Sequence, residues 1–400
     1  MSGRPSELTR RSALRLAASG AAAAVASGAR ALGMPDMEFA IRAGTLYTAT
    51  GPPIRNGVVL TRGRQIVAVG QGLPIPAGFR VLSAAVAMPG LVDAHSYLGC
   101  YREIDEPLDA LTPDLRARDA FDPADPCVAR AAFAGVTTCC IMPGNGNAMA
   151  GIGTAFRLGA HPEVLRDYAA QKLSMSAAGA QRNPTSRAGV IALIRAALDG
   201  ARRRQAVSSV TQTDLLAGFP TRLGQRVAAL APILSGERPV FVHAPRADDV
   251  ENALGLFDAY RLRGCLLHAS EAFELRDEIA RRRLPVVLGP LGFDDTDRTL
   301  ANAGKLASAG IPVAFCSDAP LADPGSLRLS ASLAADRGLS ADEALRAITR
   351  NPADLLSLGR RVGSLAPGMD ADILLLNGDP LALTSRALGT LCGGLLRLFG

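Results

Sequence analysis

Three of the four histidines in this chain stand at the ends of short apolar runs. His95 ends LVDAH, His243 ends VFVH and His268 ends CLLH, and Asp318 ends VAFCSD in the same manner. If these runs are strands of one barrel, their C-terminal ends meet on a single face. Three imidazoles and a carboxylate on that face predict a site for one divalent metal ion, with zinc as the usual occupant.

The same set of side chains predicts hydrolytic chemistry. A bound metal lowers the pKa of its water, and a nearby carboxylate can then take the proton as general base. Asp318 suits both metal ligation and this second role. A single histidine after an apolar strand is more often a hydrogen-bonded core residue, so the prediction depends on four groups from four strands. The fourth histidine, His161, precedes Pro162 and Glu163 and is expected to open a helix with a structural role.

The elements that must position these residues are alternating apolar strands and amphipathic helices. Such alternation is typical of a parallel sheet covered on both faces. About eight units fit between residues 89 and 362, which favours a closed (β/α)8 barrel over an open sheet. Residues 178–235 are rich in Ala, Arg and Ser and indicate only helix and loop. The expected strands include VTTCCIM, KLSMSA, RPVFVHA, GCLLHAS, LPVVLG and IPVAFCSDA.

Two β-rich segments flank the predicted barrel. Residues 35–88 consist of short strand-like runs separated by Pro and Gly, without helical periodicity. Residues 363–400 return to this pattern, with a turn at Pro367-Gly368, a strand from Ala371 and a hairpin around Gly393-Gly394. The two segments are expected to pair into one small composite β-sandwich domain.

The first residues have the layout of an export signal. TRRSALRLAASGAAAAVASGARALG has paired arginines, an Ala-rich stretch and a small-x-small cleavage site at Ala29-Arg30-Ala31. Arg10 and Arg11 make residues 1–34 similar to a twin-arginine signal, and an ordinary basic signal region is the alternative. The stretch is too weakly apolar for a stable membrane anchor. We therefore expect the twin-arginine (Tat) export machinery as a partner and a periplasmic or secreted protein.

Composition argues against several other classes of protein. The net charge of +6 comes with no basic run interleaved with aromatics beyond two arginine triplets, 202–204 and 281–283, so nucleic acid is not an expected partner. Seven cysteines without CxxC spacing do not form a disulfide framework. The glycines of MPGNGNAMAGIG lack the spacing of a nucleotide-binding loop and indicate a tight active-site loop.

The motifs resemble those of the amidohydrolase superfamily, in particular its imidazolonepropionase-like and dipeptidase-like branch. The resemblance runs from about Glu38 to the C-terminus and implies a (β/α)8 barrel with a composite β-sandwich, and hydrolysis by metal-activated water. By position, His95, His243 and His268 match metal ligands, and Asp318 matches the ligand and base. The segments that carry the resemblance are PGLVDAHSYLG, AGVTTCCIMPGNGNAMAGIGTAF, VHAPRADDV, LLHASEAFEL, FCSDAP and ITRNPADLLSLGRRVGSLAPGMDADILLLNGDP.

The sequence departs from the family pattern at several positions. Tyr97 stands where a second histidine is expected, and strand alternation should still point it at the site. A phenol is a poor ligand at neutral pH because its pKa is about 10, so Tyr97 is expected to bind substrate or to occlude the pocket. Pro245 and Ala319 also replace histidines that are frequent in this branch. Lys172 is the candidate for the family's carbamylated lysine. The alternative is an ordinary lysine at the surface or at a strand edge.

The leading hypothesis is a metal-dependent hydrolase that cleaves a C–N bond in a non-peptide amide, a cyclic amide or a dipeptide-like small molecule. The alternative is a catalytically silent barrel that binds a ligand or a partner. A carbohydrate- or nucleotide-binding α/β protein has little support. The acidic and arginine residues from Tyr101 to Pro126 are expected to set specificity. A homo-oligomer is compatible with the sequence.

Overall fold

The computed structural model describes residues 37–106, 108–180, 184–207, 226 and 228–399. The predicted export signal at residues 1–34 lies outside this range. No helix in the described part of the chain is both long and apolar enough to cross a membrane.

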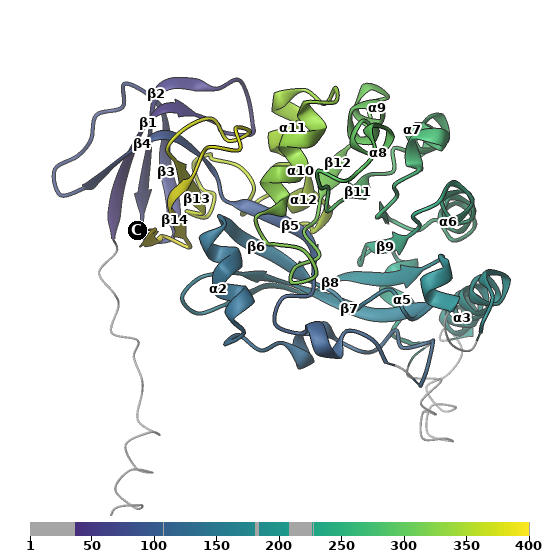
Figure 1. Ribbon diagram of the computed structural model, residues 1–400. Helices are drawn as coiled ribbons and strands as arrows, with labels where there is room; N and C mark the ends of the chain where they lie inside the picture. Colours follow the sequence, from purple (N-terminus) through teal and green to yellow (C-terminus); the bar gives the residue numbers. More distant parts are fainter. Residues whose placement is uncertain (1–36, 107, 181–183, 208–225, 227, 400) are drawn as a thin grey trace, which may run out of the picture. The chain divides into compact units, whose positions relative to one another are not determined.

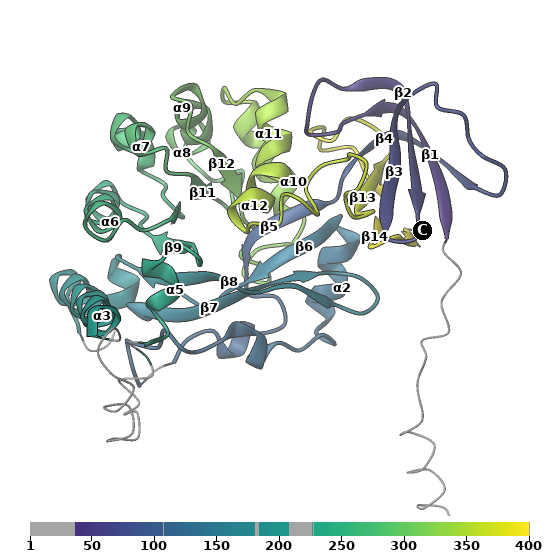
Figure 2. The same ribbon diagram turned by 180° about the vertical axis from the view of Figure 1, so that it is seen from behind.

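The strands at the two ends of the chain form one seven-stranded sheet (Figures 1 and 2), as predicted for the composite domain. The C-terminal strand β13 pairs antiparallel with β4, with Ile373 opposite Pro89, while β4 pairs parallel with β1. Phe39, Ile41 and Val59 are fully buried beneath this sheet. The order is β15-β14-β13-β4-β1-β2-β3, with β1 (Glu38–Leu46), β2 (Ile54–Arg62), β3 (Gln65–Gln71), β4 (Arg80–Pro89), β13 (Ile373–Leu376), β14 (Ala387–Cys392) and β15 (Leu395–Leu398).

A second sheet of eight strands curves into a nearly closed barrel, which confirms the predicted fold class. Its first and last strands meet through backbone hydrogen bonds from Tyr97 N to Ala319 O (2.8 Å) and from Asp318 N to His95 O (3.3 Å). The strands in order are β5 (Leu91–Ser96), β6 (Val136–Ile141), β7 (Met149–Arg157), β8 (Glu163–Ser174), β9 (Val240–His243), β10 (Gly264–Leu267), β11 (Val286–Leu288) and β12 (Val313–Phe315).

One strand of the barrel differs from the regular pattern that we predicted. β7 runs antiparallel to both β6 and β8, with no intervening helix, whereas all other neighbours in this sheet are parallel. It contains Gly151 and Gly153, which we had assigned to an active-site loop. At Gly151 an added Cβ would lie 2.5 Å from Leu115 O, so the close approach of a neighbouring loop requires glycine there. The helix expected at His161 is also absent, because β8 begins two residues later at Glu163.

Helices lie outside strands β9 to β12 and connect them (Figure 1). Side chains cap two further helices: the Asp125 carboxylate accepts from Cys127 N at the start of α2, and Ser340 Oγ accepts from Glu343 N at the start of α11. The helices are α2 (Pro126–Phe133), α3 (Arg187–Val207), α5 (Ala231–Leu234), α6 (Ala247–Tyr260), α7 (Arg276–Arg282), α8 (Asp297–Leu300), α9 (Asn302–Ser308), α10 (Ser326–Ala335), α11 (Ala341–Ala347) and α12 (Arg350–Leu355).

The interior of the barrel is a packed apolar core rather than a channel. Each of its eight strands contributes at least one fully buried residue to a single cluster, and residues from α12 and the loop after it close the end of that cluster. The strand residues include Val92, Ala94, Cys140, Ala155, Ala170, Phe241, Cys265, Leu267, Val287, Ala314 and Cys316. Functional groups in this barrel must therefore lie at the C-terminal ends of the strands, above this plug.

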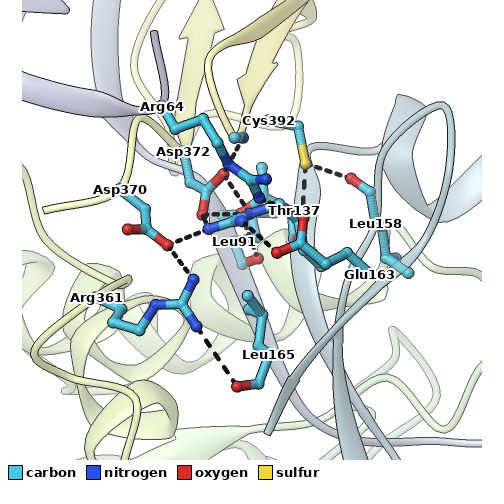
Figure 3. Close-up of polar contacts among 12 residues, drawn as sticks. Arg64, Leu91, Thr137, Leu158, Glu163, Leu165, Arg361, Asp370, Asp372 and Cys392 are labelled. Atoms are coloured by element: carbon cyan, nitrogen blue, oxygen red, sulfur yellow. Dashed lines mark hydrogen bonds and ion pairs between the residues drawn. The ribbon is translucent and has the colours of Figure 1, made fainter. Parts of the chain in front are cut away.

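A buried ion network connects the barrel to the composite sheet (Figure 3). Arg157, at the end of β7, donates from Nε to both oxygens of Asp372 at 3.2 Å and also pairs with Asp370. Arg157 is 3 % exposed and Asp372 is also buried at 3 %. Arg361 pairs with the same Asp370 at 2.8 Å. The pairs of Arg157 with Asp372 and Asp370 thus connect residues that are far apart in the chain through charges that are largely shielded from water.

Candidate metal centre

A β-bulge in β5 turns His95 toward the centre of the barrel. The pairing of β5 with β6 shifts register between Asp93 and Ser96, so the strand contains an extra residue at this point. Val92 and Ala94 belong to the interior cluster, and strict alternation would therefore turn His95 away from it. The bulge brings His95, which is 0 % exposed, to the same side.

Asp318 lies between two of the predicted histidines. Its Oδ1 is 2.7 Å from Nδ1 of His95 and 3.0 Å from Nε2 of His268. The two imidazole rings are nearly perpendicular, with centroids 5.1 Å apart. His268 and Asp318 both adopt left-handed backbone conformations, with φ of 54° and 52°. Such conformations are uncommon for residues other than glycine and cluster at functional sites.

The group that could hold a metal ion differs from the predicted one by one member. Ligand atoms of His95, His268, Cys316 and Asp318 all lie within 4.8 Å of one another. Cys316 was not predicted, and His243 is not in this group. The His243 ring is 5.2 Å from that of His268, but its Nδ1 contacts Ser176 Oγ at 2.9 Å. The structure thus brings His243 to the edge of the centre, with one nitrogen occupied by a serine.

Lys172 is part of the centre and is completely buried, so the surface alternative for this lysine is wrong. It reaches inward from β8, and its Nζ lies 2.5 Å from Nε2 of His95 and 3.4 Å from Pro143 O. Burial lowers the pKa of Lys172 to about 8, against the opposing effect of Asp318. His95 therefore has Asp318 at one ring nitrogen and Lys172 at the other.

The protonation states favour cation binding at the histidines and the aspartate. Burial, and then the charge of Lys172, lowers the pKa of His95 to about 3, so the imidazole is neutral at pH 7. Burial also lowers the pKa of His243 well below its ordinary value, with His268 as the next cause. Burial opposes ionisation of Asp318, but His268 and His95 outweigh it and hold its pKa well below the usual range. Neutral imidazoles and a carboxylate are the forms that bind a metal.

Tyr97 lies beside the centre as a neutral phenol. It is 2 % exposed, and its ring meets that of His95 edge to face at a centroid distance of 4.9 Å. Burial, followed by the charge of Asp318, raises the pKa of Tyr97 well above its ordinary value. The hydroxyl accepts a hydrogen bond from Asn145 Nδ2 at 3.4 Å. These surroundings disfavour the phenolate that metal ligation would need, which agrees with the expectation from the sequence.

A cavity adjoins the centre on the side of the loop after β5. It has a volume of about 500 Å³ and includes Pro143, whose carbonyl oxygen contacts Lys172. Its wall combines apolar residues with charged ones, among them Arg102, Glu103 and Asp105. Asp105 is held in place by Gly146 N at 3.0 Å. The loop from Tyr101 to Pro126, where we expected specificity residues, supplies most of this wall.

Sequence patterns could have identified some of the missed residues. Cys316 precedes Asp318 by two positions, so alternation on an extended strand places both on one face. Asp93 lies two positions before His95 and accepts hydrogen bonds from the backbone N–H groups of His95 (3.3 Å) and Ser317 (3.0 Å). No comparable pattern marks Ser176 as the partner of His243, since the two residues lie on neighbouring strands.

Comparisons with known proteins support the family resemblance. The profile described as "Amidohydrolase family" matches residues 245–395. The chain is 26% identical over 340 residues to the amidohydrolase tasK of Hapsidospora irregularis, a match that covers 74% of this chain and 34% of that protein. It is 39% identical over 98 residues to an imidazolonepropionase of Syntrophobacter fumaroxidans, covering 23% and 22% of the two chains. The chain thus spans about a third or less of these relatives.

A solved structure matches over a longer stretch. The amidohydrolase from Thermotoga maritima MSB8 superposes with a TM-score of 0.82 at 25% identity, covering 90% of this chain and 99% of that one. Together the matches confirm the resemblance to the amidohydrolase superfamily that the motifs predicted, and they confirm the barrel fold.

Proposed function

We propose that this protein is a hydrolase of the amidohydrolase type that uses one divalent metal ion, with zinc as the expected metal, to cleave a C–N bond with water. The substrate is a small molecule with a non-peptide amide, a cyclic amide or a dipeptide-like bond. The observation that carries the proposal is the convergence of His95, His268 and Asp318 from three different strands.

The donor set fits such an ion. The imidazoles of His95 and His268 and the ionised carboxylate of Asp318 match the minimum of three protein ligands at a catalytic zinc. A metal held there would supply a water of lowered pKa. His243 keeps Nδ1 on Ser176, and its ring lies 5.2 Å from that of His268, so its Nε2 would serve as a further ligand.

The surrounding side chains have separate roles in the proposed reaction. The Asp318 carboxylate, held ionised by its two histidines, accepts a proton as general base. The neutral phenol of Tyr97 donates a hydrogen bond to the substrate. The cavity beside Pro143 receives the rest of the substrate, and its Arg102, Glu103 and Asp105 select for charged groups.

Lys172 is compatible with the carbamylated lysine that the resemblance implies. As an ammonium group 2.5 Å from His95, it would repel a cation bound to that histidine. After the ammonium loses a proton, the neutral Nζ would add carbon dioxide and release a second proton; the resulting carbamate would replace the positive charge by a negative one and would provide an oxygen ligand.

The decisive experiment measures metal content and activity together. The mature protein, purified without chelators, should contain about one metal per chain, and His268→Ala and Asp318→Ala should each lose the metal and any amidase or dipeptidase activity. Arg246→Ala, which replaces an exposed arginine after the β9 loop, is the control and should retain both. Full activity in the His268 or Asp318 variant would contradict the proposed site.

A second candidate is a catalytically silent barrel that binds a ligand or partner. The buried Tyr97 and the ammonium group of Lys172 favour this candidate, because each stands where the family pattern has a ligand. A Tyr97→His variant separates the two functions. Gain of metal and of activity that the native protein lacks would indicate a site that has lost its chemistry.

We further propose export to the periplasm or the medium through the twin-arginine pathway, on the basis of the sequence at residues 1–34. Fractionation of cells that produce the native chain or an Arg10→Lys, Arg11→Lys double variant tests this proposal. Equal export of both proteins would contradict it.

A further inference from the structure

The centre lacks one nitrogen ligand and contains one sulfur that the family pattern does not include. Position 97 is a tyrosine whose buried phenol is a poor ligand, whereas Cys316 offers Sγ within 4.8 Å of the ligand atoms of His95, His268 and Asp318. We propose that Cys316 is a thiolate ligand of the bound metal and replaces the nitrogen that is missing at Tyr97. This inference rests on the proposed metal-dependent function.

The backbone aims the thiol at the centre. Cys316 directly follows β12 and is fully buried, and its N–H donates to Leu288 O at 3.0 Å. It lies two residues before Asp318, and its Sγ lies within 4.8 Å of a carboxylate oxygen of that residue.

The protein interactions of the thiol are weak enough to yield to a metal. The Sγ approaches two backbone oxygens at long distance, Leu288 O at 3.5 Å and Gly289 O at 3.6 Å, and it also interacts with the Asp318 side chain. A thiol is only a weak hydrogen-bond donor, whereas a thiolate is a strong ligand for zinc and for similar ions. Cys316 also has no disulfide partner.

The resulting ligand set has a chemical consequence that the nitrogen and oxygen set does not have. Two imidazoles, one carboxylate and one thiolate favour zinc or cobalt over magnesium or manganese, because sulfur ligands are soft. A histidine at position 97 would leave the choice of metal broader. The substitution of sulfur for nitrogen thus predicts a narrower metal preference as well as a spectroscopic signature.

The test uses cobalt in place of the native metal in the full chain. Cobalt bound to a thiolate has a sulfur-to-metal charge-transfer absorption in the near ultraviolet, which cobalt bound only to nitrogen and oxygen lacks. We expect this absorption in the native protein and in Cys265→Ala, and its loss in Cys316→Ala and Cys316→Ser. Cys265 is the matched control, because it is equally buried in the same interior cluster but lies outside the metal group.

Metal affinity gives an independent readout by equilibrium dialysis. Cys316→Ala should weaken cobalt and zinc binding by at least about tenfold, since loss of groups that only support ligands already has effects of that order. Adding Tyr97→His to Cys316→Ala should recover affinity without restoring the charge-transfer absorption. Circular dichroism of each variant, compared with that of Cys265→Ala, establishes that the barrel is folded.

The outcomes separate this inference from the proposed function. Cobalt bound without charge-transfer absorption would overturn the role of Cys316 and leave the metal-dependent hydrolase standing. Absorption that persists in Cys316→Ala would also overturn it, because another thiol would then be the ligand. A native protein that binds no metal at all would overturn both proposals.

Discussion

Asp93 supports the metal centre through the backbone rather than through a ligand atom. Its carboxylate accepts from the N–H groups of His95 and Ser317, and also from the Ser317 hydroxyl. His95 lies on the first strand of the barrel and Ser317 follows the last strand, so a single side chain joins the two ends of the sheet beside Asp318. Such a group stabilises the barrel and orients two ligands at once.

Replacement of Asp93 tests this role. Asp93→Ala would leave three buried donors without an acceptor, and at about 1 kcal/mol or more for each donor we expect a loss of about 3 kcal/mol in the free energy of unfolding. Asp93→Asn keeps one acceptor oxygen and the side-chain volume, so its loss should be smaller. Urea denaturation measures both values. If Asp93→Ala is as stable as Asp93→Asn, the hydrogen bonds that Asp93 accepts contribute little to the free energy of unfolding.

The places of Lys172 and Cys316 in the centre were hard to predict from the sequence for one common physical reason. Strand ends and residue types identified His95, His268 and Asp318 because polar groups after apolar runs are conspicuous. Lys172 was a candidate for the carbamylated lysine, but a surface or strand-edge position stayed open because lysine is almost never fully buried without a partner, and its partner, His95, lies on a different strand. Cys316 looked like a small apolar residue because cysteine packs as one. Contacts between strands decide both cases.

At the scale of elements, β10 depends on a close approach to β9. An added Cβ on Gly264, the first residue of β10, would lie 1.8 Å from Val240 O and 2.6 Å from Val240 N. Both of these are backbone atoms that belong to the strand pairing, so they cannot move aside without breaking it. The strand therefore needs glycine at this position to keep His268 in place at its other end.

Two glycine substitutions should have opposite effects on stability. Gly264→Ala forces β10 away from β9 and should lower the free energy of unfolding by about 3 kcal/mol, the upper end of ordinary overpacking costs. Gly255→Ala, on the exposed face of α6 with no atom near the added Cβ, should raise it by about 0.5–1 kcal/mol. Thermal unfolding checks the pair. A destabilised Gly255 variant would contradict the helix assignment.

The strands were predictable to different degrees for local reasons. β9 and β10 are continuous apolar runs that lead into histidines, and both were predicted. β7 was missed because Gly151 and Gly153 lower strand propensity and resemble a loop. Its glycines reflect contacts with neighbouring segments, at Leu115 and at Met142, that the local sequence does not encode.

At the scale of the whole molecule, Arg157 joins the two sheets. Its guanidinium donates hydrogen bonds to the buried Asp372 and forms an ion pair with Asp370. These contacts connect residues next to β13 with the end of β7. The predicted pairing of the chain ends required only strand patterns, and it was correct. The ion network could not be predicted, because Arg157 is one of many arginines in the chain and its partners are more than two hundred residues away.

Removal of Arg157 should destabilise the protein strongly. Arg157→Ala leaves the Asp372 carboxylate buried and unpaired, and breaking a buried pair on one side costs about 3–5 kcal/mol. Arg62→Ala breaks the exposed pair with Glu38 and should change stability by less than about 1 kcal/mol. Chemical denaturation of both variants measures the difference. If Arg157→Ala changes stability as little as Arg62→Ala does, Asp372 becomes protonated or hydrated at little cost in free energy.

The composite sheet also constrains the order in which the strands can pair during folding. β4 pairs with β1 on one side and with β13 on the other, and the entire barrel lies between these partners in the chain. On the ribosome, β4 must therefore wait with one edge unpaired until the last strands have emerged, and pairings this distant in sequence form slowly. Backbone amides of β13 should gain protection from hydrogen exchange late in refolding. Protection that appears there before the barrel strands would contradict this order.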